Sequence, residues 1–126
     1  MAILSERSRV GCYIISEAGG ETGGMRSRDV GTLLAGTKYA PGQLLGFVTA
    51  SEKYAPLNAA GADGTENATA ICFGWYDATA ADYDGAVLTV RETEANGLEL
   101  VWPNGISDAD KTAAIADLAA LGIIVR

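Results

Sequence analysis

Carboxylates are numerous among the side chains in this sequence that could do chemistry. The 126 residues include 16 Asp and Glu, only 9 Lys and Arg, and no histidine. Glu92, Glu94 and Glu99 lie close together along the chain, and two neighbouring carboxylates can serve as the acid and the base of a glycosidase. Solvent-facing strand positions are the more common place for such residues. Carboxylate catalysis is therefore the least favoured of three functional hypotheses, and we expect the protein not to be an enzyme.

A second acidic group could supply oxygen ligands to calcium. Asp77, Asp82 and Asp84 are closely spaced, but they lack the spacing and the terminal glutamate of an EF-hand, which favours a solvated acidic loop. With no histidine and no CxxC pair, a zinc site is not expected. The four glycines within residues 19–24 lack the lysine and the following helix of a phosphate-binding loop. We therefore expect no metal and no cofactor.

The remaining reactive or ligand-binding candidates are thiols and aromatic rings. Cys12 and Cys72 could form one disulfide in an oxidising compartment, but both lie among hydrophobic residues, which favours two reduced thiols. Four aromatic residues could form a platform for a sugar or another ligand: Trp75, Tyr76, Tyr83 and Trp102. Core or interface positions are commoner for such rings. A ligand-binding or carbohydrate-binding module displayed on a surface is therefore the second hypothesis.

Length and charge narrow the class of protein. A chain of 126 residues indicates one domain that can bury a core of its own. The net charge of −7 argues against a nucleic-acid partner and against an anionic membrane surface. No run approaches the ~18 apolar residues of a membrane helix, and residues 1–16 lack the layout of a secretory signal. These features indicate a soluble domain.

The last quarter of the chain contains the clearest structural signals. Ser107 is a good N-cap, Asp110 lies in the first turn that follows it, and Gly122 suits the position after a helix. Leu118 and its neighbours recur at helical spacing among many alanines. The predicted elements are a strand over 98–102, a turn over 103–105, a helix over 108–121 and a buried strand over 123–125.

Alternating or continuous apolar stretches predict strands in the rest of the chain. They cover residues 10–15, 30–34, 43–50, 53–57, 68–76 and 86–93. Pro56 predicts an edge strand, Gly46 a bulge or a close approach, and Asn96 with Gly97 a hairpin. The small residues of 68–76 could receive the alanine-rich helix. The fold class is mixed α/β and mainly β: a small sheet or barrel-like domain with one C-terminal helix.

The N-terminal part reads as an extended arm. Four glycines within residues 19–24 predict a flexible hinge, which makes residues 1–24 an arm and residues 25–126 the body. The predicted strand over 10–15 has the β-branched and aromatic content to add to a sheet edge. That edge could belong to a partner, to a neighbouring subunit or to the body of the same chain.

The order of the motifs resembles the head decoration family of tailed phages, to which the lambda head decoration protein D belongs. The resembling segments are SRDV at 27–30, PGQLLGFV at 41–48, KYAPL at 53–57, DG at 63–64, LVWP at 100–103 and LAALGIIVR at 118–126. A weaker similarity covers residues 10–17. The resemblance implies a mostly β fold that forms homotrimers, binds the major capsid protein at local threefold axes on the outside of an expanded head, and stabilises the head against internal DNA pressure.

The same resemblance implies how the residues divide. It implies an arm that contacts the capsid shell, no catalytic residues, no cofactor, and a place on the outer surface of the virion after synthesis in the host cytoplasm. The expected capsid contacts of the arm are Val10, Tyr13, Ile14, Ile15, Arg26 and Arg28. The expected core residues are Leu45, Phe47, Trp75, Trp102, Leu118 and Ile123. The first and favoured hypothesis is therefore a structural decoration protein, with residues 25–126 as its decoration domain.

Overall fold

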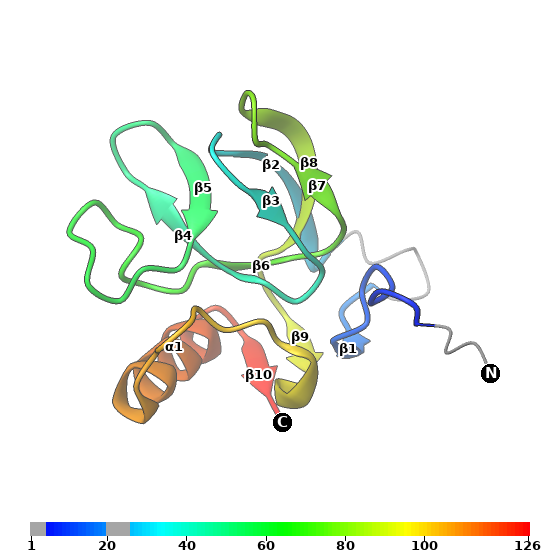
Figure 1. Cartoon of the computed structure of the whole chain (residues 1–126). Helices are drawn as coiled ribbons and strands as arrows, with labels where there is room; N and C mark the ends of the chain where they lie inside the picture. Colours follow the sequence, from blue (N-terminus) through cyan, green and yellow to red (C-terminus); the bar gives the residue numbers. More distant parts are fainter. Residues whose placement is uncertain (1–4, 20–25) are drawn as a thin grey trace.

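A closed barrel of five strands forms the upper half of the molecule in Figure 1. The structure is a computed structural model that describes residues 5–19 and 26–126. The barrel strands are β2 (Arg28–Leu33), β4 (Leu44–Val48), β5 (Lys53–Pro56), β6 (Ala70–Cys72) and β8 (Tyr83–Thr89). Their order around the barrel is β2-β5-β4-β6-β8, and only the β2–β5 pair is parallel. Closure removes the free edges that an open sheet would present.

A smaller layer packs beneath the barrel. Its sheet has the order β1-β9-β10, with β1 (Ile14–Glu17) antiparallel and β10 (Ile123–Val125) parallel to the central β9 (Thr93–Ala95). The helix α1 (Asp108–Ala120) lies beside this sheet, and the 3₁₀ helix η2 (Gly97–Glu99) follows β9 (Figure 1). A separate two-stranded ladder joins β3 (Lys38–Tyr39) to β7 (Tyr76–Asp77).

The core has two parts that correspond to these layers. One cluster fills the barrel and includes Leu33, Leu45 and Leu88. The other lies between the barrel and the lower layer and includes Tyr13, Leu44, Ile71, Leu118 and Ile123. Adjacent barrel residues such as Leu44 and Leu45 therefore face different clusters, as the two-residue period of a strand requires.

The predicted C-terminal helix and strand are confirmed. The side chain of Ser107 accepts a hydrogen bond from the Asp110 amide at 3.1 Å, which satisfies one of the free donors of the first turn. Gly122 follows the helix with a φ of +82°, the left-handed conformation in which glycine is favoured. The chain then enters β10, whose Ile123 is fully buried.

The predicted strand over 98–102 and the hairpin at Asn96 and Gly97 are wrong. The Asn96 side chain accepts a hydrogen bond from the Leu98 amide at 3.0 Å and so caps η2 instead of turning a hairpin. Only Val101 makes a β-bridge, to Gln43 of the barrel. An Asn side chain offers the backbone a local partner that competes with a sheet ladder.

Two predicted long strands are each divided in the structure. Residues 68–76 contain β6 and the start of β7, and residues 86–93 contain the end of β8 and the start of β9, because the chain leaves the barrel at these points. The helix-facing residue of β6 is Ile71, which shares a cluster with Ala114 and Leu118. The small residues Ala70 and Cys72 face the barrel, so the expected small-residue face for the helix is also wrong.

Pro56 does not mark an edge strand. The Leu57 amide donates to the Leu44 carbonyl at 3.0 Å. Because backbone groups alternate in direction along a strand, the backbone nitrogen of Pro56 faces away from β4. The parallel pairing with β2 is confined to Leu33 and Tyr54. The pairing of β5 with β4 therefore does not need the N–H that Pro56 lacks.

Gly46 lies where two backbones meet, and it supports a test of barrel packing. A Cβ at Gly46 would lie 2.4 Å from Thr65 Cα, whereas one at Gly31 would meet the ring of Tyr54 at 2.8 Å. We expect Gly46→Ala to destabilise the fold by roughly 1–3 kcal/mol, because a backbone cannot move aside as a side chain can. Gly31→Ala is the matched control with the smaller loss. Equal denaturation midpoints for both variants would contradict this account.

Candidate functional site

The N-terminal segment enters the core of the body at Tyr13. Tyr13 is fully buried, and its hydroxyl lies 2.6 Å from the Thr89 hydroxyl of the barrel. The residues that follow form β1, in which Ile14 pairs with Ala95 and Glu17 with Thr93. The sequence left open whether this strand would pair with a partner, with a neighbouring subunit or with its own chain. In the structure, β1 pairs with β9 of its own chain.

A part-buried ion pair links the end of β1 to the barrel. The Arg28 guanidinium makes a two-pronged contact with the Glu17 carboxylate, which also accepts a hydrogen bond from Ser27 Oγ at 2.7 Å. The same guanidinium lies 4.1 Å from the ring centroid of Phe73. A planar guanidinium suits both partners at once. Arg28 thus links β1 to the barrel, and its guanidinium is engaged within the chain.

The other expected arm contacts differ in their access to solvent. Val10 and Ile15 are 56% and 54% exposed, which leaves both side chains available to a partner. Arg26 is exposed and pairs with Glu92 at 3.3 Å. Ile14 is half-buried against the lower cluster. The side chain of Tyr13, which is also among the expected contacts, is fully buried in this chain.

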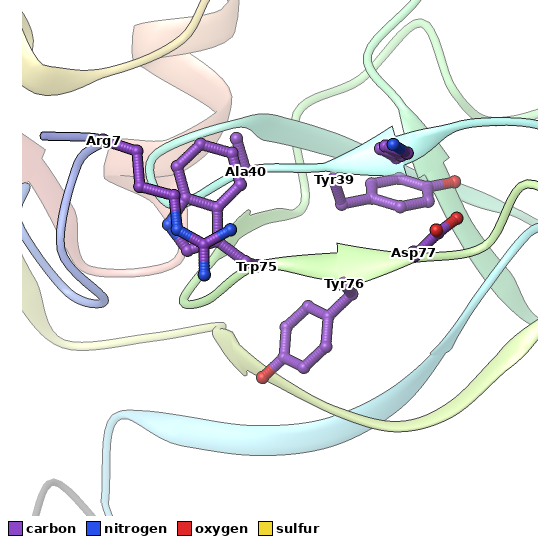
Figure 2. Close-up of a pocket in the computed structure, with 7 residues that line it drawn as sticks. Arg7, Tyr39, Ala40, Trp75, Tyr76 and Asp77 are labelled. Atoms are coloured by element: carbon purple, nitrogen blue, oxygen red, sulfur yellow. The ribbon is translucent and has the colours of Figure 1, made fainter. Parts of the chain in front are cut away.

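Residues before Tyr13 lie over an exposed tryptophan, an arrangement that the sequence did not indicate. The Trp75 indole N–H donates to the Ser8 carbonyl at 2.7 Å, and the Arg7 guanidinium lies 4.6 Å from the Trp75 ring centroid (Figure 2). The two partners are 67 residues apart in sequence, so no local pattern could reveal the contact. Trp75 is 37% exposed, which corrects its expected place in the core.

Trp75 also borders a hollow of about 510 Å³. Lys38, Tyr39, Tyr76 and Asp77 complete its wall with Arg7 (Figure 2). Arg7 covers one face of the Trp75 ring, and the Tyr76 hydroxyl accepts a hydrogen bond from the Val87 amide at 2.9 Å. These groups are already used within the protein, which leaves little of an aromatic platform for a sugar.

The remaining expected core residues fall into two groups. Leu45, Leu118 and Ile123 are fully buried. Phe47 is half-buried and meets Tyr54 edge-on with centroids 5.0 Å apart. Trp102 is half-buried, packs against the lower cluster, and has the Lys111 ammonium 5.7 Å from its ring centroid. Phe47 and Trp102 therefore border the clusters, whose interiors contain Tyr13, Tyr39 and aliphatic side chains.

The candidate catalytic carboxylates are drawn to separate partners. Glu94 accepts from Ser16 at 2.8 Å and from Arg126 at 2.9 Å, and these bonds, that of Arg126 first, hold the pKa of its carboxyl below the ordinary value. Glu92 binds Arg26. Glu99 lies near Cys12, whose thiol pKa is raised by burial and then by that charge. This arrangement does not hold any two of these three carboxylates together as an acid and a base.

The aspartates proposed as calcium ligands are likewise engaged one by one. Asp77 accepts from the Thr79 hydroxyl at 2.6 Å and Asp84 from the Thr32 hydroxyl at 2.9 Å. Asp82 binds Lys53 and the Ala35 amide, and these bonds hold its carboxyl pKa below the ordinary value. Across residues 5–19 and 26–126, no three metal-ligating side chains gather into a possible site. Cys12 and Cys72 are both free thiols.

A comparison with protein families matches nearly the whole of this structure. The model of the bacteriophage lambda head decoration protein D family covers residues 8–123, from the segment beside Trp75 to the first residue of β10. The chain belongs to this head decoration family. It is therefore a structural protein of the bacteriophage capsid, as the order of its motifs indicated. A search of curated proteins found no significant match.

The decoration protein carries its exposed apolar side chains at several separate places. Leu98 at the tip of η2 is 93% exposed, and Val30 on the barrel is 64% exposed. Val101, Leu121 and Ile124 are also exposed in the lower layer. Among the helices in the described part of the chain, none has the length and hydropathy to cross a bilayer. Apolar residues scattered singly in this way are normal on a protein surface and do not by themselves mark a binding site.

Buried phenol and thiol groups predict how the decoration protein responds to alkali. Burial raises the pKa of Tyr39 and of Cys72 to about 12 each, and it raises the pKa of Tyr13 as well. The unfolded chain ionises first, from pH 9.0 for Cys and 10.0 for Tyr. Stability is therefore complete below about pH 9 and falls as the pH rises toward 12. Chemical denaturation in steps across this range measures the loss, and a constant midpoint would contradict it.

Proposed function

We propose that this protein is a cementing protein of the phage head, which binds as a homotrimer to the outer surface of the expanded capsid. It occupies local threefold axes, contacts the major capsid protein and stabilises the shell against the pressure of packaged DNA. The observation that carries the proposal is the family match over residues 8–123, which spans the barrel, the helix and the lower sheet. The engaged carboxylates and the covered Trp75 ring give no comparable support to an enzyme or a carbohydrate-binding module.

We propose that the shell-contacting arm is shorter than residues 1–24. Tyr13 is buried in the body and β1 pairs with β9, so the contacts to the shell come from residues that precede Tyr13 and from the exposed Ile15. The predicted glycine hinge falls mainly on residues 20–25, and residues 1–4 precede the first described segment, so both lie outside the described residues. Two basic residues and one acidic residue lie within residues 1–12, against seven and 15 in residues 13–126. Electrostatic attraction of this N-terminal part to an acidic shell surface would orient the molecule.

The test uses purified expanded heads that lack the decoration protein. We expect saturable binding with a plateau of three copies per local threefold axis, threefold protrusions in electron microscopy, and greater resistance of the filled head to heat. Light scattering of the free protein and image classification of the decorated head report the trimer. Absence of binding to undecorated heads would refute the proposed function, and density of one or two copies at each site would refute the trimer.

A further inference from the structure

We propose that Trp75 and Arg7 hold residues 5–10 in a fixed conformation, so that the capsid-contacting segment is ordered before the shell is met. This inference rests on the proposed function. Trp75 is a positioning residue in this scheme, and Arg9 and Val10 make the contact. The partner surface that fits them is an apolar patch of the shell bordered by carboxylates.

Three contacts fix the segment to the body. The Arg7 guanidinium lies 4.6 Å from the Trp75 ring centroid (Figure 2). The Trp75 indole N–H donates to the Ser8 carbonyl at 2.7 Å. The Gly11 amide then donates to the Phe73 carbonyl at 2.8 Å. The contacts with Arg7 and with Ser8 both involve the Trp75 side chain. Loss of this one side chain would therefore release residues 5–10, which precede Gly11.

The segment is held by one side and leaves the other side free. The Arg9 side chain is 82% exposed. It pairs with Glu6, three residues earlier, but an exposed ion pair contributes little to fixing the Arg9 side chain. Val10 is more than half exposed beside Gly74. An apolar group and a cation thus point outward from a backbone that is already fixed.

Fixing this backbone in advance favours binding. A segment that is ordered only on the shell loses its conformational freedom at that moment, which weakens association. We call the contacts of Trp75 and Arg7 with residues 5–10 the latch, and the form in which they are made the latched form. If only the latched form binds, the apparent dissociation constant for the shell rises as the latched fraction falls. The trimer would apply this factor at each of its three arms, so a small change per arm becomes a large change for the particle.

Trypsin reports the latch directly, because Arg9 lies within the segment. Cleavage after Arg9 in the folded protein, followed by mass spectrometry, measures how often residues 5–10 leave the body. Arg7 is itself a tryptic site, so each rate is divided by the rate for a free peptide of residues 5–12 with the same sequence; on this scale we expect Arg7→Ala to raise cleavage after Arg9 by about 2–5-fold, the effect of one exposed cation–π contact. Adding Trp75→Phe, which removes the indole donor, should bring the increase to roughly tenfold. Lys38→Ala, a change of another cation at the same hollow, is the matched control and should leave the rate unchanged.

Binding to undecorated heads then separates positioning from contact. The Arg7→Ala/Trp75→Phe variant should bind about 2–3-fold more weakly per arm, whereas Lys38→Ala binds like the original protein. Val10→Ser should weaken binding and leave Arg9 cleavage unchanged. Unaltered thermal melting shows that the body of each variant is intact.

The opposite results would overturn the inference. Unchanged Arg9 cleavage in the double variant would show that Trp75 does not hold the segment. Faster cleavage with unchanged or tighter binding would show that the latch is irrelevant to the shell or competes with it. If the original protein binds no heads, the proposed function fails and the role of the latch in binding fails with it, while cleavage still decides whether the latch exists.

Discussion

Replacing Tyr13 by alanine should destabilise the free protein more than any change at an exposed position of the arm. The ring is fully buried in the lower cluster, and the hydroxyl lies 2.6 Å from the Thr89 hydroxyl. Removal of a buried aromatic ring costs about 3–5 kcal/mol, which corresponds to a fall of roughly 10–20 °C in the melting temperature of a domain of this size. Thermal or urea unfolding followed by circular dichroism measures the loss.

Ile15→Ala is the matched control, because Ile15 lies two residues away with its side chain 54% exposed. We expect this control to change stability by less than about 1 kcal/mol. Deletion of residues 1–10 should also leave the melt nearly unchanged, whereas deletion of residues 1–24 removes Tyr13 and β1 and should prevent stable folding. A cooperative melt at the original temperature after the longer deletion would show that residues 13–17 are dispensable.

Truncation after Gly122 should abolish the folded state. It removes β10, which pairs with β9 from Ile123 to Val125 and brings the Arg126 amide to the Ala95 carbonyl at 2.8 Å. Burial of Ile123 alone contributes enough that Ile123→Ala should cost about 2–5 kcal/mol, a large part of a total stability of about 5–15 kcal/mol. Chemical denaturation of the point variant and the near-ultraviolet spectrum of the truncated protein measure these losses.

The neighbouring residue supplies the control for the C-terminal strand. Ile124 faces the opposite side of β10 and is 38% exposed, so Ile124→Ala should cost only about 1 kcal/mol or less. Comparable losses for Ile123→Ala and Ile124→Ala would mean that the strand does not present one face to the core as described.

Local chemistry in the sequence was enough to determine the helix, its cap and the final strand. Ser107 and Gly122 act through neighbours within a few residues, so their effect is nearly independent of the rest of the fold. The mainly β class and the decoration family also followed from the sequence, because strand periodicity and the order of motifs are carried by the chain itself.

Tertiary structure alone decided where strands end and which partner the N-terminal segment meets. The long apolar stretches were divided because the chain passes from the barrel to the lower sheet, a change of layer that leaves no mark on a two-residue alternation. Tyr13 and Trp75 exchanged their expected places, the first inside and the second at the surface. Both contain an apolar ring, and what separates them is the arrival of Thr89 at one ring and of Arg7 and Ser8 at the other. These partners lie 67 or more residues away, so only chain folding could bring them there.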